Sequence, residues 1–282
     1  MAAPQRCATA TTLLQLLLLA GGCARESSGG ASRAEVELGA KIFTRTQNYD
    51  RSLASNALAC SNCHLDGGRQ TGALSLLGAA KRYPMPGAGG RSFTLEDRIA
   101  RCFTHSLSGK APDPASPEAK ALVAYLTSLS AGSAAPPPLH ARSNAIDPAN
   151  IVPIAQLNAS RGRTKYDQFC SGCHGLDGQG YREKHTPLPY DYVPPVWGPR
   201  SYDNAAGLAR VYTLAGFVRH AMPWDDPGEV SDLDAQEIAA FVDGQPRPDF
   251  PDKSAWDATL PPDAVYDPKQ YPTNPFFVPL DQ

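Results

Sequence analysis

Apolar residues recur at helical spacing in two stretches, each of which begins at a serine that can cap a helix. Ser116 stands before Pro117 at the start of the first stretch, and Ser231 opens the second, which ends before Gly244. The apolar faces are formed by Leu122, Tyr125, Leu126 and Leu129 in the first and by Ile238, Phe241 and Val242 in the second. The pattern predicts two amphipathic helices that pack on a core.

A third helix is predicted from Thr94 to Ser106. Asp97 follows Thr94 by three residues, which is typical of a capped helix N-terminus. The apolar stripe of this helix is formed by Leu95, Ile99, Cys102 and Phe103. We therefore expect Cys102 to point inward, with Arg98 and Ser106 close to the same face.

A short cysteine motif occurs twice, as "CSNCH" at residues 60–64 and as "CSGCH" at residues 170–174. C-x-x-C-H is the covalent attachment site of c-type haem, in which both thiols bond the porphyrin and the histidine ligates the iron. The motifs predict two covalently attached haem c groups. Their attachment residues would be Cys60, Cys63, Cys170 and Cys173, and their first iron ligands His64 and His174.

Two other uses of paired cysteines fit this sequence less well. The two pairs lie much farther apart than the about 15–20 residues of a zinc ribbon. Zinc also does not require a histidine directly after each pair. A thioredoxin-like redox pair needs a βαβ context, which the sequence lacks. We therefore expect haem at both motifs.

The two motifs lie in two copies of one unit. Gly39 and Phe43 precede the first motif, and Gly162 and Tyr166 precede the second. Each copy closes with one of the two amphipathic helices described above. The repeat predicts an all-α fold made of two class I cytochrome c-like domains.

The expected domain boundaries follow from composition. The first domain spans residues 34–132 and the second 151–250, and a small, polar, proline-rich linker at 133–150 joins them. Residues 251–282 are again proline-rich, and we expect this tail to wrap the second domain as extended chain without a site of its own.

Residues 1–23 are predicted to be a signal peptide, because a basic residue and a short apolar run precede small residues and Cys23. The run is shorter than the about 20 apolar residues that span a bilayer. Its end is similar to a bacterial lipoprotein cleavage site, which would make Cys23 a lipid-carrying N-terminus; an ordinary secretory signal is the alternative. We expect a periplasmic protein, anchored to the membrane if Cys23 is lipidated. The formal net charge of −2 provides no basic field for nucleic acid.

The second ligand of each iron decides between electron transfer and chemistry. In the second domain, Met222 follows His174 by 48 residues, and His220 is its competitor. We expect Met222, which raises the potential and suits electron transfer. In the first domain, Met85 follows His64 by only 21 residues, too few to reach the far side of the porphyrin.

Cys102 and His105 both have the reach in the first domain, at 38 and 41 residues after His64. We expect Cys102 to be the ligand, since His105 is turned toward the flank of the predicted helix. The alternative is that Cys102 is a small buried residue of the core. Its surroundings argue for a ligand, because cations favour a thiolate. The cations between residues 81 and 110 are Lys81, Arg82, Arg91, Arg98, Arg101 and Lys110, against only Glu96 and Asp97.

These segments resemble the di-haem c-type thiosulfate dehydrogenases, which couple two thiosulfates into tetrathionate and can also work as tetrathionate reductases. The similar stretches are "ACSNCHLDGG" (59–68), "LEDRIARCFTHSLSGK" (95–110), "FCSGCHGLDGQG" (169–180) and "PPVWGPRSYDNAAGLARVYTLAGFVRHAMPW" (194–224). The resemblance implies a His/Cys active-site haem, carried by His64 and Cys102, and a His/Met electron-transfer haem, carried by His174 and Met222. Two positions depart from the family pattern. His105 stands where an arginine is expected, and Ala221 stands where some relatives have a lysine thought to exchange with the methionine, so we expect no such ligand exchange.

The function implied is that of a thiosulfate dehydrogenase that passes electrons from the first haem to the second and on to a soluble acceptor, such as a cytochrome. Joining two dianions requires cations. We expect Arg98 and Arg91, with Arg82 as a further candidate, to hold the sulfonate oxygens. Ser106 would add a hydroxyl donor, and Cys102 would carry substrate sulfur as a covalent adduct.

Two other functions remain open on the sequence alone. A di-haem electron carrier without substrate chemistry would show no response of its haem spectrum to thiosulfate, and it leaves the face of Arg98, Cys102 and Ser106 unexplained. A di-haem peroxidase would need an open or displaceable histidine site, for which His105 is the candidate.

Overall fold

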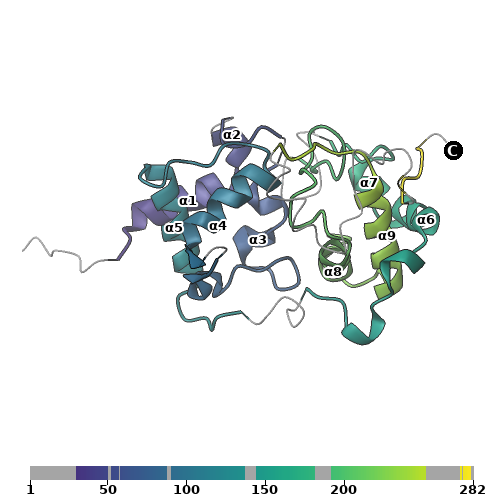
Figure 1. The fold of residues 1–282 in the computed structure, drawn as a ribbon, viewed down its shortest axis with the longest axis horizontal. Helices are drawn as coiled ribbons and strands as arrows, with labels where there is room; N and C mark the ends of the chain where they lie inside the picture. Colours follow the sequence, from purple (N-terminus) through teal and green to yellow (C-terminus); the bar gives the residue numbers. More distant parts are fainter. Residues whose placement is uncertain are drawn as a thin grey trace, which may run out of the picture. The chain divides into compact units, whose positions relative to one another are not determined.

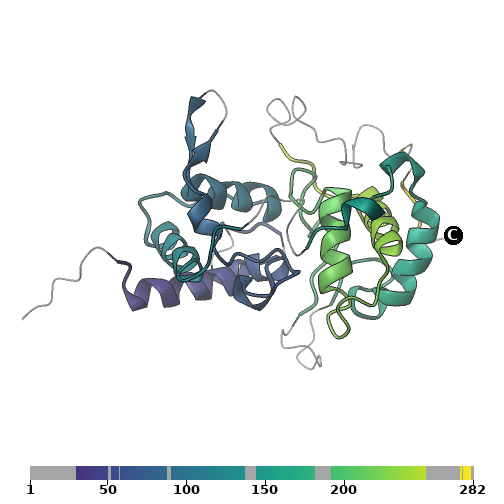
Figure 2. The ribbon, with the colours of Figure 1, turned by 90° about the horizontal axis from the view of Figure 1, so that it is seen from below.

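The computed structural model describes residues 30–49, 52–56, 58–87, 90–136, 144–181, 192–251, 274 and 276–280 (Figure 1). The chain divides at Gly30, and the fold given below is that of the residues after it. Within the described ranges the only strands are β1 (Met85–Pro86) and β2 (Ser92–Phe93), which pair antiparallel with Met85 opposite Phe93. This hairpin projects from the helices of the first domain (Figure 2). The predicted all-α fold is confirmed.

The first domain is built on the packing of α1 (Arg33–Thr44) against α5 (Pro117–Leu129). A Cβ added at Gly39 would lie 2.0 Å from the carbonyl oxygen of Ala121, so only glycine permits this approach. Beside the crossing, the ring of Phe43 packs 5.3 Å from that of Tyr125. The predicted cap is present, since Ser116 accepts a hydrogen bond from the first turn of α5.

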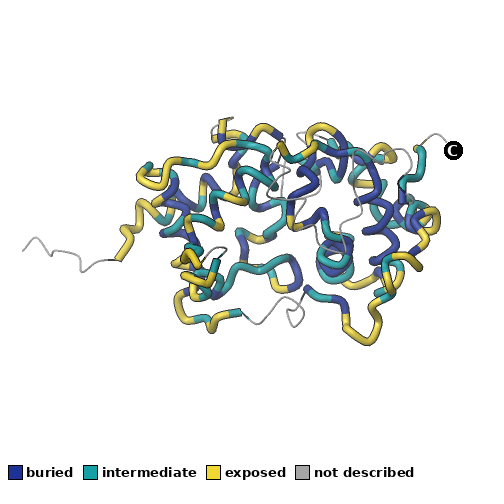
Figure 3. The backbone as a smooth tube through the Cα atoms, viewed as in Figure 1, coloured by how far each residue is buried: buried dark blue, intermediate teal, exposed yellow. Residues whose placement is uncertain are grey.

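The second domain repeats this arrangement with α6 (Ala159–Phe169) and α9 (Asp232–Gly244). A Cβ at Gly162 would lie 1.9 Å from the carbonyl oxygen of Glu237, and the rings of Tyr166 and Phe241 lie 5.5 Å apart. A further helix, α8 (Val211–Ala221), packs against α9. Both α8 and α9 are dark over much of their length in Figure 3, because most of their residues are buried.

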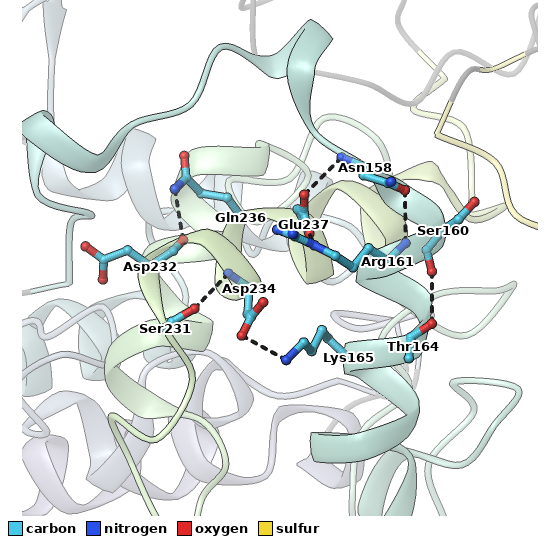
Figure 4. Close-up of polar contacts among 10 residues, drawn as sticks. All are labelled: Asn158, Ser160, Arg161, Thr164, Lys165, Ser231, Asp232, Asp234, Gln236 and Glu237. Carbon is cyan, nitrogen blue, oxygen red and sulfur yellow. Dashed lines mark hydrogen bonds and ion pairs between the residues drawn. The ribbon is translucent and has the colours of Figure 1, made fainter.

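Polar contacts fix the register of α6 on α9 (Figure 4). Arg161 pairs with Glu237, and Lys165 pairs with Asp234 at 3.2 Å. The carboxylate of Glu237 is 4% exposed and also accepts the backbone N–H of Asn158. The two pairs are made by Arg161 and Lys165, which lie before and after Gly162 on α6.

The third predicted helix is present only in part. It begins at Thr94, whose side chain and that of Asp97 cap each other's backbone N–H groups, and α4 runs over Leu95–Arg101. From Cys102 to Ser106 the backbone forms a π-helical turn, in which the N–H of Leu107 donates to the carbonyl of Cys102. Such wide turns inside helices are frequent at functional sites.

The remaining described elements are short and connect these helices. They are α2 (Thr46–Tyr49), η1 (Cys60–Asn62), α3 (Leu65–Gly68), η2 (Ala79–Arg82), η6 (Pro148–Asn150), η7 (Ile154–Gln156) and α7 (Ser171–His174). None of the helices in the described part of the chain is long and apolar enough to cross a membrane.

Parts of the expected linker and tail pack on the second domain. Asn144 and Ile146 are buried, and the carbonyl of Asn144 lies against Gly216 of α8. Phe276 is buried against Gly244, and Arg163 of α6 donates to main-chain carbonyls at the end of the described chain. Residues 137–143 of the linker and 252–273 of the tail lie outside the described residues, as do residues 1–23.

Candidate haem centres and active site

Each histidine of the two cysteine motifs is held by a main-chain carbonyl. Nδ1 of His64 lies 2.6 Å from the carbonyl oxygen of Leu74, and Nδ1 of His174 lies 2.9 Å from that of Pro194. A carbonyl only accepts, so Nδ1 carries the hydrogen and the lone pair of Nε2 is left for a metal. Burial also lowers the pKa of His174, which favours the neutral imidazole that can ligate iron.

In each domain a tyrosine of a helix forms a hydrogen bond with the loop that follows the motif. The hydroxyl of Tyr125 donates to the carbonyl of Gly67 at 2.7 Å, and that of Tyr166 donates to the carbonyl of Gly175 at 2.8 Å. The first tyrosine comes from α5 and the second from α6. In both domains the segment after the histidine is thereby fixed on the helix crossing.

The cysteines of the first motif interact electrostatically with the candidate ligand Cys102. Burial raises the pKa of Cys60 and of Cys63 to about 12, and the charge of the Cys102 thiolate adds to the rise in both. Such an interaction weakens with distance, so Cys102 belongs to the surroundings of this motif. Cys102 itself is half-buried, while Leu95, Ile99 and Phe103 of the predicted stripe are buried.

The residues present fit covalently bound haem. Each domain offers two thiols and a histidine whose Nδ1 lies beside a main-chain carbonyl, which is the donor set of a c-type haem. The zinc alternative needs at least three converging ligands. In the described ranges, no three His, Cys, Asp or Glu side chains converge closely enough to hold a metal ion.

Arg98 is the cation that the structure places beside Cys102. It precedes Cys102 by one helical turn, and the N–H of Cys102 donates to its carbonyl. The Cys102 sulfur raises the pKa of the Arg98 guanidinium, and the hydroxyl of Tyr83 adds to this effect. Arg98 is also exposed, so it can meet an anion from solvent. Tyr83 was not predicted from the sequence, where a single tyrosine in a loop carries no signal.

The other two cations proposed to hold substrate have contacts elsewhere. Arg91 is 63% exposed and pairs with Asp97 at 2.9 Å, at the opposite end of α4 from Cys102. Arg82 donates to the carbonyl of Pro136. Ser106 ends the π turn, and its carbonyl accepts from the amide of Asn56. Of these three arginines, Arg98 is the one that interacts with Cys102 in the described contacts.

His105 belongs to the π-helical turn and has contacts with both domains. Its ring stacks on Phe250 of the second domain, with the centroids 4.3 Å apart, and Nδ1 lies 2.8 Å from the hydroxyl of Thr104. Burial lowers the pKa of His105 to about 4, and Arg101 contributes to this shift. The ring is thus neutral and packed between the domains.

The two candidate ligands of the second domain differ in their contacts. Nε2 of His220 lies 2.9 Å from the carbonyl oxygen of Ala145, so this nitrogen already has a hydrogen-bond partner. Met222 follows the end of α8 and is partly buried against the core. Met85, rejected as a ligand for its spacing, is 42% exposed on β1.

Comparison with known proteins identifies both domains. Residues 46–135 match the SoxA/TsdA cytochrome c domain, and residues 157–242 match the domain of cbb3-type cytochrome c oxidase subunit III. A thiosulfate dehydrogenase of Stutzerimonas stutzeri is 34% identical over 77% of this chain and 68% of its own length. One of Allochromatium vinosum is 33% identical over 78% of this chain and 81% of its own. The chain belongs to the thiosulfate dehydrogenase family.

A solved thiosulfate dehydrogenase has the same fold. The chain is similar to thiosulfate dehydrogenase (TsdBA) from Marichromatium purpuratum in its "as isolated" form, with a TM-score of 0.69 and 28% identity. The match covers 84% of this chain and 54% of the TsdBA chain, so this chain spans about half the length of that relative. The two predicted cytochrome c domains and the predicted family are confirmed. As in that family, the cofactors are two covalently bound c-type haems.

Proposed function

We propose that this chain couples two thiosulfates into tetrathionate in its first domain and passes the electrons out through its second. The balanced reaction is 2 S₂O₃²⁻ → S₄O₆²⁻ + 2 e⁻, and its reverse would use the same site. The supporting observation is the position of Cys102, which opens the π-helical turn one helical turn after Arg98 and interacts electrostatically with Arg98, Cys60 and Cys63. Thiosulfate is inferred as the substrate because the chain belongs to the thiosulfate dehydrogenase family.

Four residues are proposed to hold each of the two haems. Those of the first are Cys60, Cys63, His64 and Cys102, and those of the second are Cys170, Cys173, His174 and Met222. When bound, each haem supplies a one-electron acceptor, with the thiolate-ligated one at lower potential than the methionine-ligated one. His64 and Cys102 would then supply the two protein ligands of the first iron.

Cations would offset the repulsion between the two thiosulfate dianions. The guanidinium of Arg98 would donate paired hydrogen bonds to the sulfonate oxygens, since its planar fork matches an oxyanion. Ser106 is proposed as a hydroxyl donor on the same turn. Arg91, exposed beyond Asp97, is proposed to attract the dianion toward the site rather than to hold it at Cys102.

Cys102 is proposed to carry the reacting sulfur. In the first half-reaction its thiolate forms a bond with the outer sulfur of thiosulfate, giving Cys–S–S–SO₃⁻ with the loss of two electrons. In the second, the outer sulfur of another thiosulfate attacks the middle sulfur of this adduct, which lies between the cysteine sulfur and the sulfonate group. The bond to the cysteine sulfur breaks, so tetrathionate leaves and the Cys102 thiolate is restored. Charge and atoms balance in both halves, and Arg98 offsets the repulsion between the anions.

The protein works in the periplasm, as cytochrome c thiosulfate dehydrogenases do. We propose that its electrons pass to a soluble acceptor protein. Lipidation of Cys23 would in addition fix the enzyme to a membrane surface, and mass spectrometry of the mature N-terminus tests this directly.

The experiment that tests the proposal replaces Cys102 with glycine. Cys102→Gly should retain both haems, because their attachment cysteines are untouched, but lose thiosulfate oxidation with ferricyanide as acceptor. Low-temperature electron paramagnetic resonance of the oxidised protein should lose its thiolate-type signal and keep the methionine-type one. Thr104→Ala, on the same turn, is the matched control and should keep both. Full activity of Cys102→Gly would refute the covalent role of Cys102. A haem spectrum that never responds to thiosulfate would instead favour a di-haem electron carrier without substrate chemistry.

A further inference from the structure

The side chain of Asn56 has a hydrogen-bond partner for each of its polar groups. The residue is 9% exposed, and its NH₂ group donates to the carbonyl of Ser106 at 2.9 Å and to that of Ser201 at 3.2 Å. Its oxygen accepts the backbone N–H of Leu58 at 3.0 Å. Carbonyls only accept and a backbone N–H only donates, so these partners decide the orientation of the amide. Aspartate and leucine, which are of similar size, would lack both donors.

The three partners of Asn56 belong to three parts of the protein. Leu58 stands two residues before the first haem motif. Ser106 ends the π-helical turn that Cys102 opens. Ser201 lies in the second domain. One side chain therefore connects the first haem motif, the turn of the proposed iron ligand and the other domain.

Ser201 is itself fixed in the loop that holds the second histidine. It is fully buried, and its hydroxyl donates to the carbonyl of Pro195 at 3.1 Å. The preceding carbonyl, that of Pro194, lies 2.9 Å from Nδ1 of His174. Asn56 thus joins the π-helical turn of the first domain to the loop that anchors an imidazole in the second.

The π-helical turn ends in carbonyls that need partners from outside it, because the last carbonyls of a helix have no donor within the helix. The segment 52–56 supplies such donors. The backbone N–H of Ser55 donates to the carbonyl of Leu107 at 3.1 Å, next to the bond from the Asn56 amide to Ser106. The end of the turn is therefore held by this segment.

A second contact joins the same turn to the second domain. The ring of His105 stacks on that of Phe250, with the centroids 4.3 Å apart. Stacked rings tolerate an offset, whereas a hydrogen bond requires a short distance and a defined angle. The amide of Asn56 therefore restricts the position of the turn more than the stacking does.

We propose that Asn56 is a positioning residue for Cys102, because it caps the π-helical turn and fixes that turn to the second domain. The inference rests on the proposed role of Cys102 at the first haem. Asn56 would act through the carbonyl of Ser106, four residues after Cys102, and not by contact with substrate. Without its two donors the turn should open at least about tenfold more often, since two carbonyls would lose their partner.

The spectroscopic test compares the holoprotein with Asn56→Asp, which presents only acceptors to the two carbonyls. Asn56→Ala removes the donors without adding charge and serves if the carboxylate prevents folding. In both variants we expect low-temperature electron paramagnetic resonance to show a weaker thiolate-type signal and an unchanged methionine-type signal. Asn56→Gln, which keeps both donors, should retain more of the thiolate-type signal than either. The same signal in the parent and in these variants would overturn the inference.

Alkylation of Cys102 gives a readout that does not depend on iron ligation. Iodoacetamide would be added to the oxidised holoprotein, and mass spectrometry of the peptide that contains Cys102 would give the rate of modification. This rate should rise at least about tenfold in Asn56→Asp, because the turn opens more often. Ser231→Ala, which removes a helix cap in the second domain, is the matched control for lost stability and should leave the rate unchanged.

Steady-state kinetics shows whether the defect lies at Cys102 or in substrate binding. With ferricyanide as acceptor, we expect kcat of Asn56→Asp to fall about tenfold and KM for thiosulfate to change by less than about twofold, since Arg98 is not altered. A raised KM at full kcat would contradict the assignment to Cys102.

The outcomes separate this inference from the proposed function. If the parent oxidises thiosulfate and shows the thiolate-type signal, but Asn56→Asp has the same signal and the same alkylation rate, the positioning role is refuted and the proposed function stands. If the parent shows no thiolate-type signal while alkylation of Cys102 still rises in Asn56→Asp, Asn56 positions the turn and the proposed ligation of iron by Cys102 fails.

Discussion

Replacing Gly162 by alanine tests whether the helix crossing of the second domain is as close as the structure shows. The added Cβ would lie 1.9 Å from the carbonyl oxygen of Glu237, whereas ordinary contact begins at 3.4 Å. The helices α6 and α9 must therefore separate by about 1.5 Å, or bend, to admit one methyl group. A shift of that size would also stretch the 3.2 Å pair between Lys165 and Asp234 beyond contact.

The expected cost is about 3 kcal/mol, at the upper end of the range for overpacked cores, because the atom that is struck belongs to backbone and cannot rotate away. For a domain of about 100 residues, this lowers the melting temperature by roughly 12–24 °C. The measurement is unfolding of the holoprotein in guanidinium chloride and by heat, followed by circular dichroism. Gly39→Ala should behave alike, since its Cβ would lie 2.0 Å from the carbonyl of Ala121.

Gly207→Ala is the control, because no atom lies within 4 Å of the Cβ it would add. If Gly162→Ala and Gly207→Ala unfold at the same midpoint, the close crossing is refuted. The inference from the repeated glycine to a repeated helix pair would then lose its physical basis.

Three further predictions address a cap, a buried acid and the substrate cation. Ser231→Ala removes the 3.1 Å hydrogen bond from the N–H of Asp234 and should cost about 1 kcal/mol in the same denaturant titration. Burial raises the pKa of Asp203 to about 7, so between about pH 4 and 7 the folded state binds a proton that the unfolded chain has lost. Asp203 should therefore contribute a fall in stability of about 2–4 kcal/mol from pH 4 to pH 8, while the lowered pKa of His105 contributes in the opposite direction. The Asp203 contribution is measured as the difference between the parent and Asp203→Asn; equal pH dependence in melts of the two proteins would contradict it. Arg98→Gln should raise KM for thiosulfate at least about tenfold in steady-state assays, with Arg98→Lys in between, and unchanged values would remove Arg98 from the site.

Much of the helical framework could be predicted from the sequence because its signals are local. Ser116 and Ser231 each cap a helix by accepting from the backbone N–H three residues on, so the residue type indicates where the helix begins. The haem motifs are local as well, since two thiols and an imidazole must reach one porphyrin. These features are therefore found where the pattern placed them.

The site was less predictable, because its geometry depends on backbone and on distant contacts. The stripe of Leu95, Ile99 and Phe103 fits an ordinary helix, and nothing in it shows that the turn widens at Cys102. Counting cations could not separate Arg98 from Arg91, because Arg98 lies in the last turn of α4, next to Cys102, whereas Arg91 precedes the helix and pairs with Asp97 in its first turn. The stacking of His105 joins two domains and has no signal in either one.

The carbonyls of Leu74 and Pro194 that hold the two imidazoles belong to the main chain, so no side-chain substitution there can delete them. One imidazole is anchored 10 residues beyond its motif and the other 20, yet both receive the same kind of acceptor. The two irons would thus be given equivalent nitrogen donors, however far the loops diverge in evolution. A difference in potential between the two haems would then be sought first in the other proposed ligands, the Cys102 thiolate and the Met222 thioether. Substitutions at those two positions are therefore the first to test for an effect on the direction of electron flow.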